Sequence, residues 1–213
     1  MTLSPPLRKT LLALHVMASV GWLGSVAAFL ALSVLAAYGS DLEVVRAAYI
    51  SMDPVGWWAV VPLNLLALLI GTVLAVATPW GLLRHYWVAT KLILTVLGTG
   101  LLLMHQTLVV QQVAALASAG TPMTDGSLHH MGVQLVWAAG FGLLLLVTLT
   151  ALSVFKPWGP TKSALRRQYG SLDMQQEATS SIPGSLKLFY GAVVVTLLTF
   201  MMIHMPGHMH HHG

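Results

Sequence analysis

The chain has 213 residues, of which 56% are hydrophobic and 8% are charged, and this composition excludes a water-soluble domain, which could not hide so much apolar surface. It contains no cysteine, which excludes disulfides, thiolate metal sites and cysteine nucleophiles. The formal net charge is +4, but the basic residues lie in separate segments instead of one basic arm, which argues against a nucleic-acid partner and leaves the lipid bilayer as the expected surrounding.

Five apolar segments are long enough to cross the hydrocarbon layer, which needs about 20 helical residues. They predict an all-α, integral membrane bundle of five transmembrane helices. The predicted spans cover residues 11–38, 55–77, 87–116, 129–155 and 186–205. A His/Met-rich tail follows at 206–213, and the whole chain 1–213 is expected to form a single transmembrane helical domain.

Charged residues alternate between the predicted connecting segments. The N-terminal segment, the second loop and the fourth loop are basic, whereas the first loop is mainly acidic and the third carries only Asp125. By the positive-inside rule, this alternation predicts a cytoplasmic N-terminus, an extracytoplasmic C-terminus and five crossings. The chain is accordingly expected to be a multi-pass protein of the bacterial inner (plasma) membrane.

Ionisable residues inside the spans are costly in hydrocarbon and are therefore candidates for function. His15 lies about one turn inside the predicted cytoplasmic edge of the first span, and Lys91 lies near the cytoplasmic end of the third. These two residues predict an inner polar layer. A structural role is the alternative for each, because His15 could be a satisfied packing residue and Lys91 could extend its amine to the interface.

A second, outer polar layer is expected in the other half of the spans. His105 lies deep in the third span, fourteen residues after Lys91 and on nearly the same face. His130 begins the fourth span and is expected to face the bundle at nearly the depth of His105, together with His204 of the fifth span. Asn64 is expected to hydrogen-bond into this layer, or to act only as a polar link between helices.

Facing imidazoles at one depth in a helical bundle are what a b-type haem requires, because its iron takes neutral imidazole axially. The leading hypothesis is therefore a membrane redox protein with haem b held by His15 and Lys91, and by His105 and His130. Electrons would pass to a quinone or to a partner chain of a larger membrane complex. The chain is thus a candidate haem-dependent oxidoreductase, while the sequence assigns no catalytic residue and no oligomeric state.

The C-terminal segment indicates a different metal, because imidazole and thioether side chains together suit copper in either oxidation state. The expected metal ligands are His204, Met205, His208, Met209, His210, His211 and His212. This favours a second hypothesis, a copper handling or import protein, although a purification tag is the alternative interpretation of the tract. A third hypothesis is a cofactor-free accessory subunit of a membrane complex, in which the histidines serve packing.

The stretch Leu14-His15-Val16-Met17-Ala18-Ser19-Val20-Gly21-Trp22-Leu23-Gly24 resembles the first helix of a superfamily of small bacterial membrane proteins. That superfamily includes the copper-resistance D domain, the HemJ-type protoporphyrinogen oxidases and a related group of uncharacterised integral membrane proteins. The stretch from Thr78 to Leu92 looks most like that last group, and the resemblance covers about residues 10–110. It implies a shared four-helix core, and by position it implies that His15 and Lys91 match the residues tied to activity and haem in the HemJ-type enzymes.

Overall fold

The computed structural model describes the backbone of residues 3–77, 82, 84–122, 126–161 and 184–204, with side chains up to residue 195. Within these segments the regular elements are all helices. The chain divides into two compact units, residues 1–164 and 165–213. The second unit contains α9 (Gly184–His204), which matches the predicted fifth span as far as the described residues reach.

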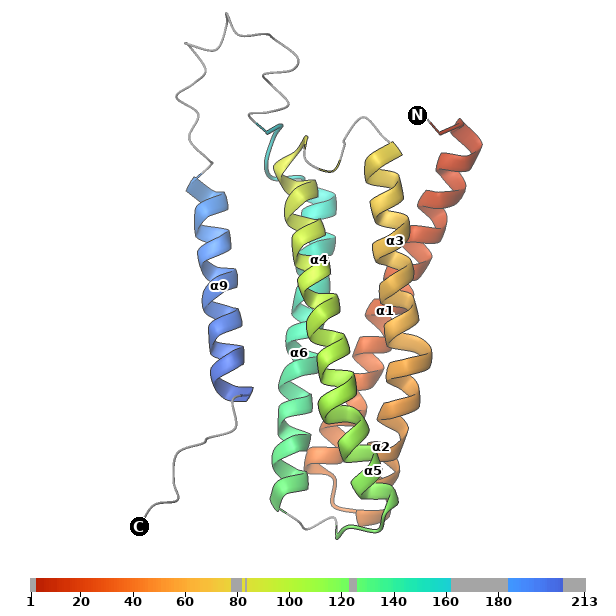
Figure 1. Cartoon of the computed structure of the whole chain (residues 1–213), viewed down its shortest axis with the longest axis vertical. Coiled ribbons are helices and arrows are strands. Elements are labelled where there is room, and N and C mark those ends of the chain that lie inside the picture. The colour runs from red at the N-terminus through yellow and green to blue at the C-terminus, as the bar shows by residue number, and fades with distance from the viewer. Residues whose placement is uncertain (1–2, 78–81, 83, 123–125, 162–183, 205–213) are drawn as a thin grey trace, which may run out of the picture. The chain divides into compact units, whose positions relative to one another are not determined.

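Four helical segments of the first unit are long and apolar enough to cross a membrane (Figure 1). The first is α1 (Pro5–Tyr38) and the last is α6 (Gly126–Phe155). The two between them are composite: α2 (Leu42–Val55), the π turn η1 (Gly56–Val60) and α3 (Val61–Ala77) form one, and α4 (Tyr86–His105), the π turn η2 (Gln106–Val110) and α5 (Gln111–Ser118) form the other. By helix length and hydropathy, the chain is a multi-pass membrane protein.

Two helices begin earlier than the apolar pattern predicts. α1 starts at Pro5 because prolines occupy its first turn, where a missing N–H breaks no helical hydrogen bond. The predicted loop before residue 55 is largely wrong, since the chain is helical from Leu42 onward. Asp41 caps this helix by accepting hydrogen bonds from the N–H groups of Glu43 and Val44, at 2.9 and 3.4 Å.

A π turn lets this second helical segment run through two prolines. Pro54 lies inside α2 and Pro62 lies in the first turn of α3, and neither can donate a backbone hydrogen bond. Between them, the N–H of Val61 bonds to the carbonyl of Gly56, five residues back. Such a one-residue widening keeps the helix continuous and occurs frequently at functional sites in other proteins.

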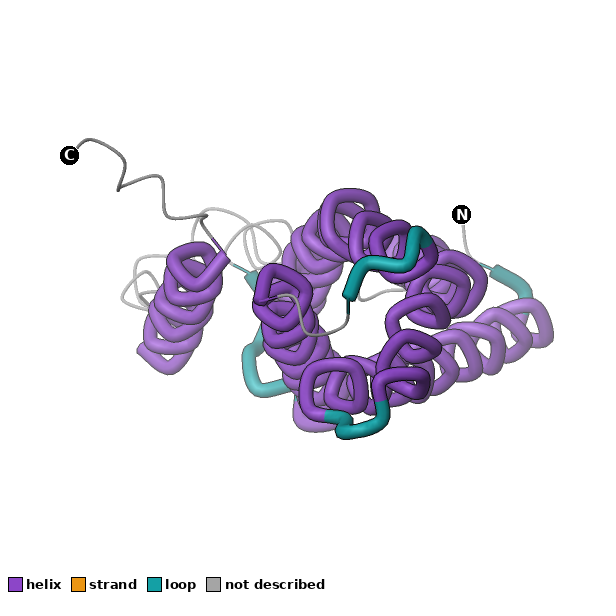
Figure 2. Tube along the Cα trace, turned by 90° about the horizontal axis from the view of Figure 1, so that it is seen from below, coloured by secondary structure: helices purple, strands orange, loops and turns teal. Residues whose placement is uncertain are grey.

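The four segments form a ring of neighbours when viewed along the helix axes (Figure 2). α1 packs against α2, α3 and α6, and α4 packs against α3 and α6. α1 and α4 therefore face each other across the interior. Both begin at the upper end of the view in Figure 1, where α3 and α6 end.

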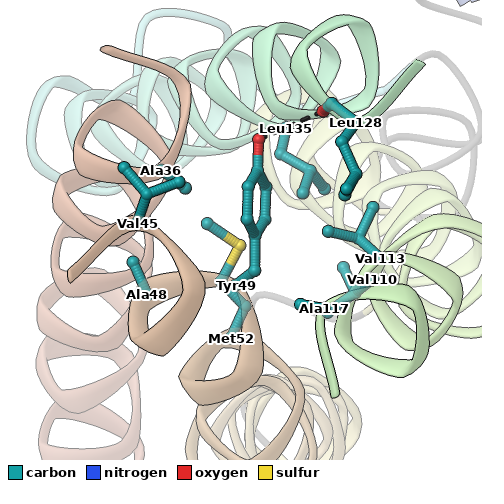
Figure 3. Packing of buried hydrophobic residues seen from close by; sticks show 10 residues of the cluster. All are labelled: Ala36, Val45, Ala48, Tyr49, Met52, Val110, Val113, Ala117, Leu128 and Leu135. Carbon is teal, nitrogen blue, oxygen red and sulfur yellow. Dashed lines mark hydrogen bonds between the residues drawn. The ribbon is translucent and has the colours of Figure 1, made fainter. Parts of the chain in front are cut away.

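The lower half of the ring encloses an apolar cluster (Figure 3). The cluster contains Ala36, Val45, Ala48, Tyr49, Met52, Val110, Val113, Ala117, Leu128 and Leu135. At its centre the hydroxyl of Tyr49 donates to the carbonyl of Leu128 at 3.1 Å. A Cβ at Gly132 would lie 2.2 Å from that hydroxyl, so the close approach of α2 to α6 requires glycine there. This cluster fixes the position of the lower ends of four helices.

Candidate functional site

His15 and Lys91 lie at one level in the upper half of the bundle, as the sequence predicts. A Cβ at Gly142 of α6 would lie 3.7 Å from the side chain of Val26, which aligns α6 with α1. Because the two helices are antiparallel, His15, eleven residues before Val26 on α1, lies level with Ser153, eleven residues after Gly142 on α6. The amine of Lys91 donates to the hydroxyl of Ser153, and Lys91 lies close enough to His15 for the two groups to interact electrostatically.

The ring of His15 is held between α1 and α3. A Cβ at Gly71 would lie 2.8 Å from Cε1 of the ring, so the imidazole rests directly on the backbone of α3. The ring hydrogen-bonds to the backbone carbonyl of Ala67, while its Nδ1 atom is buried and has no partner. We call His15, Gly71, Lys91 and Ser153 the upper polar layer. Gly71 and Ser153 were not predicted as members of this layer. Periodicity shows on which face of its helix a residue lies, but not which residues of other helices it contacts.

A lower polar layer forms where the two π turns meet. Gln106, which is 1% exposed, donates from Nε2 to Oδ1 of Asp53 at 3.1 Å and to its backbone carbonyl at 3.3 Å. The end of the Gln106 side chain lies against Gly56, where a Cβ would be 2.0 Å from Oε1. The lower polar layer therefore consists of Asp53, Gly56 and Gln106. This layer was not predicted from the sequence, because the charges around Asp53 resemble a loop, although the nearby Pro54 and Gly56 mark an irregular helix.

The predicted pairing of His105 with His130 is wrong. His105 is buried, but His130 is exposed and its ring contacts the amide of Gln134 on its own helix, at 3.2 Å. A Cβ at Gly98 would lie 2.7 Å from Leu145, and this contact aligns α4 with α6. Because the two helices are antiparallel, His105, seven residues after Gly98, lies level with residue 138, seven residues before Leu145. Residue 138 is eight residues, or about 12 Å, from His130 along α6. The two rings thus differ in depth and in direction.

Asn64 does not join the outer layer as predicted. Its side chain is fully buried, and neither its Nδ2 nor its Oδ1 atom has a hydrogen-bond partner among the described residues. Trp22 of α1 is also buried, with an Nε1 atom that lacks a partner in the same part of the chain. Both residues lie between the two polar layers.

The predicted copper ligands lie almost wholly outside the described residues. His204 ends α9, where the structure describes the backbone alone, and Met205, His208, Met209, His210, His211 and His212 follow it. Across the described segments, no group of three or more His, Asp or Glu side chains is placed to hold a metal ion. Copper binding by the tail stays a prediction.

In comparisons with known proteins, no family model, curated protein or solved structure matches the chain. The family resemblance of residues 10–110 therefore stays a prediction. The structure by itself shows a helical protein with four apolar segments that are long enough to cross a membrane.

Proposed function

We propose that this protein is a membrane redox protein that binds haem b at the upper polar layer. The observation that carries the proposal is the placement of His15 and Lys91 at one level on α1 and α4, which face each other across the bundle. Cofactors of helical bundles are held in this way, by side chains that project inward from facing helices. The level is near one end of the bundle, so anionic haem propionates could lie toward water.

The two ring nitrogens of His15 are arranged as in a histidine that binds haem iron axially. Metal-bound histidines usually hold one ring nitrogen on a backbone carbonyl or carboxylate and bind the metal through the other. In His15 the carbonyl of Ala67 takes the first role, and the unpartnered Nδ1 is available for the second. Bound haem would supply one-electron chemistry at its iron, with a quinone or a partner chain as the electron acceptor.

Lys91 fits the other end of the cofactor. Its amine is a compact positive charge, which suits a propionate carboxylate, and the hydroxyl of Ser153 positions it. The proposal contains one site only. The second site predicted from His105 and His130 is not included, because His130 is exposed and bonds along its own helix.

An absorption spectrum of the purified protein tests the proposal. Protein expressed with an adequate haem supply should show a Soret band and, after reduction with dithionite, a sharp α band. Extraction should yield about one protohaem per chain, as expected for a single site. A spectrum without a Soret band, together with an extract without protohaem, would favour the cofactor-free accessory subunit instead.

We also propose five crossings, with the N-terminus in the cytoplasm of a bacterium. Support comes from the alternation of basic and non-basic connections and from the apolar sequence of α9. Because the chain contains no cysteine, single cysteines at Thr121, Gly159 and Gly213 can be probed with an impermeant maleimide. Thr121→Cys and Gly213→Cys should react in intact cells, and Gly159→Cys only after permeabilisation. If Gly213→Cys did not react with the maleimide in intact cells, the proposed fifth crossing would be ruled out.

A further inference from the structure

The four helical segments of the first unit are longer than a bilayer requires. They contain 34, 36, 33 and 30 residues, which corresponds to about 45–54 Å at about 1.5 Å per residue. The hydrocarbon layer is about 30 Å thick. At a tilt of about 20°, the average for transmembrane helices, the segments would still extend about 42–51 Å along the membrane normal. Part of the bundle therefore lies outside the hydrocarbon.

Two exposed tryptophans lie at one level of the bundle. The alignment of α4 with α6 brings Gln106 level with Trp137, and Gln106 lies against Gly56. Trp58 follows Gly56 by two residues, or about 3 Å along the axis. The side chains of Trp58 and Trp137 are 85% and 52% exposed. We call the height of these two residues the lower tryptophan level.

A lysine and a tryptophan mark a second level near the other end of the bundle. Nζ of Lys156 lies 5.9 Å from the ring centroid of Trp87. Trp87 precedes Gln106 by 19 residues on one helical segment, a distance of about 29 Å. Tryptophan is enriched at both membrane surfaces, and lysine extends its amine toward them. The separation of this upper level from the lower tryptophan level therefore matches the thickness of one hydrocarbon layer.

The exposed surface of the bundle changes at the lower tryptophan level. Above it, every exposed residue apart from Thr150 is apolar or glycine, in the described ranges 12–31, 58–77, 87–106 and 137–155. The hydroxyl of Thr150 donates to the carbonyl of Leu146 at 2.9 Å and so needs no partner from lipid. Below the level, charged and polar residues join the exposed apolar ones. They include Glu43, Gln111, Gln112, Ser118, His129 and His130.

The buried side of α2 has the pattern of a helix that contacts water. Its buried residues form a single stripe, at steps of three, one and three residues: Val45, Ala48, Tyr49 and Met52. They belong to the apolar cluster of Figure 3, all of which lies below the lower tryptophan level. Lipid tails are as apolar as such side chains, so apolar clusters gain no hydrophobic stabilisation inside hydrocarbon. The hydrophobic effect stabilises this cluster only if water surrounds it.

We propose that the hydrocarbon lies between the upper level and the lower tryptophan level, and that the bundle below Trp58 and Trp137 projects into water. The projecting part contains α2, α5 and the adjoining ends of α1 and α6, at the lower end of Figure 1. Lipid headgroups meet the indoles of the two tryptophans, whose rings are apolar and whose N–H groups donate. The carboxylate of Asp53 then lies at the membrane surface, where a charge costs less than in hydrocarbon.

Spin labels on single cysteines test this inference, because the chain has no cysteine of its own. His130→Cys and Leu144→Cys form a matched pair, since both positions are exposed and lie seven residues before and after Trp137. Each variant is labelled with a nitroxide and reconstituted in vesicles of phosphatidylcholine and phosphatidylglycerol. Two collision rates are measured, one with oxygen, which concentrates in hydrocarbon, and one with a nickel chelate that stays in water.

A second pair tests the same boundary on another helical segment. Ala47→Cys and Leu69→Cys are also at exposed positions, eleven residues before and after Trp58. Labels at positions 47 and 130 should collide with nickel several-fold more often than labels at 69 and 144, and the order should reverse for oxygen. Equal ratios of the two rates within each pair would overturn the proposed boundary.

The result does not depend on the proposed function. A protein without a Soret band would contradict haem binding and leave the expected collision rates unchanged. Circular dichroism of each labelled variant shows whether it is folded, and the two pairs lie on different segments, so a variant that fails to fold leaves the other pair to decide.

Discussion

Gln106 occupies the space in which a side chain at position 56 would have to lie. A Cβ on Gly56 would be 2.0 Å from Oε1 and 2.5 Å from Cδ of Gln106, whose amide is held in turn by Asp53. The two π turns can therefore meet only because residue 56 is glycine. This contact joins the second and third helical segments at one level and keeps the side chain of Gln106 buried.

Gly56→Ala should destabilise the protein by about 1–3 kcal/mol, the usual cost of overpacking a well-filled interior. The Gln106 side chain cannot move aside without losing its hydrogen bonds to Asp53. Thermal unfolding in detergent, followed by circular dichroism, measures the effect. Gly100→Ala is the control, because Gly100 is an exposed helical glycine with open space around it and should gain stability. Equal midpoints for the two variants would refute the packing argument.

Tyr49 and Gly132 should be energetically coupled. Tyr49→Phe loses the hydrogen bond to Leu128 and should cost about 0.5–1.5 kcal/mol. Gly132→Ala should cost about 1–3 kcal/mol in wild type but less in the Tyr49→Phe background, since the hydroxyl is the atom nearest to the new Cβ. A double-mutant cycle of unfolding free energies measures the coupling. Strictly additive costs would show that the hydroxyl does not limit the approach of α6.

Gly71→Ala should lower the haem content of the purified protein without removing any proposed ligand. The new Cβ would lie 2.8 Å from Cε1 and 3.3 Å from Nδ1 of His15, so the ring must turn away from α3 and lose its contact with Ala67. Haem per chain is measured by the pyridine haemochrome of each sample. Gly140→Ala, at a helical glycine with no atom near its Cβ position, should retain full haem. Similar haem contents in the two variants would contradict the proposed orientation of His15.

The sequence was informative where periodicity alone decides the structure. Four apolar segments were predicted, the first, third and fourth at nearly their observed positions, and the shared level of His15 and Lys91 followed from their distances to the predicted span ends. The start of the second segment was not predicted, because Asp41, Glu43 and Asp53 resemble a loop by charge. In the structure Asp41 caps the helix, and Asp53 lies on its inward side, bound to Gln106.

The errors at His130 and Asn64 share a physical cause. Periodicity gives the angle between residues of one helix, but the rotation of that helix depends on packing, as at Gly132 beside Tyr49. His130 was therefore assigned to the wrong side of its helix. The π turns add a further difficulty, because one extra residue per turn changes the face of every residue that follows, Asn64 included.

The most direct test of the account is the haem content of His15→Ala compared with that of His130→Ala. Both variants remove one imidazole, but only His15 faces the bundle interior, with a buried, unpartnered nitrogen. The account predicts a Soret band in wild type and His130→Ala, and its loss from folded His15→Ala. An undiminished Soret band in His15→Ala would contradict it.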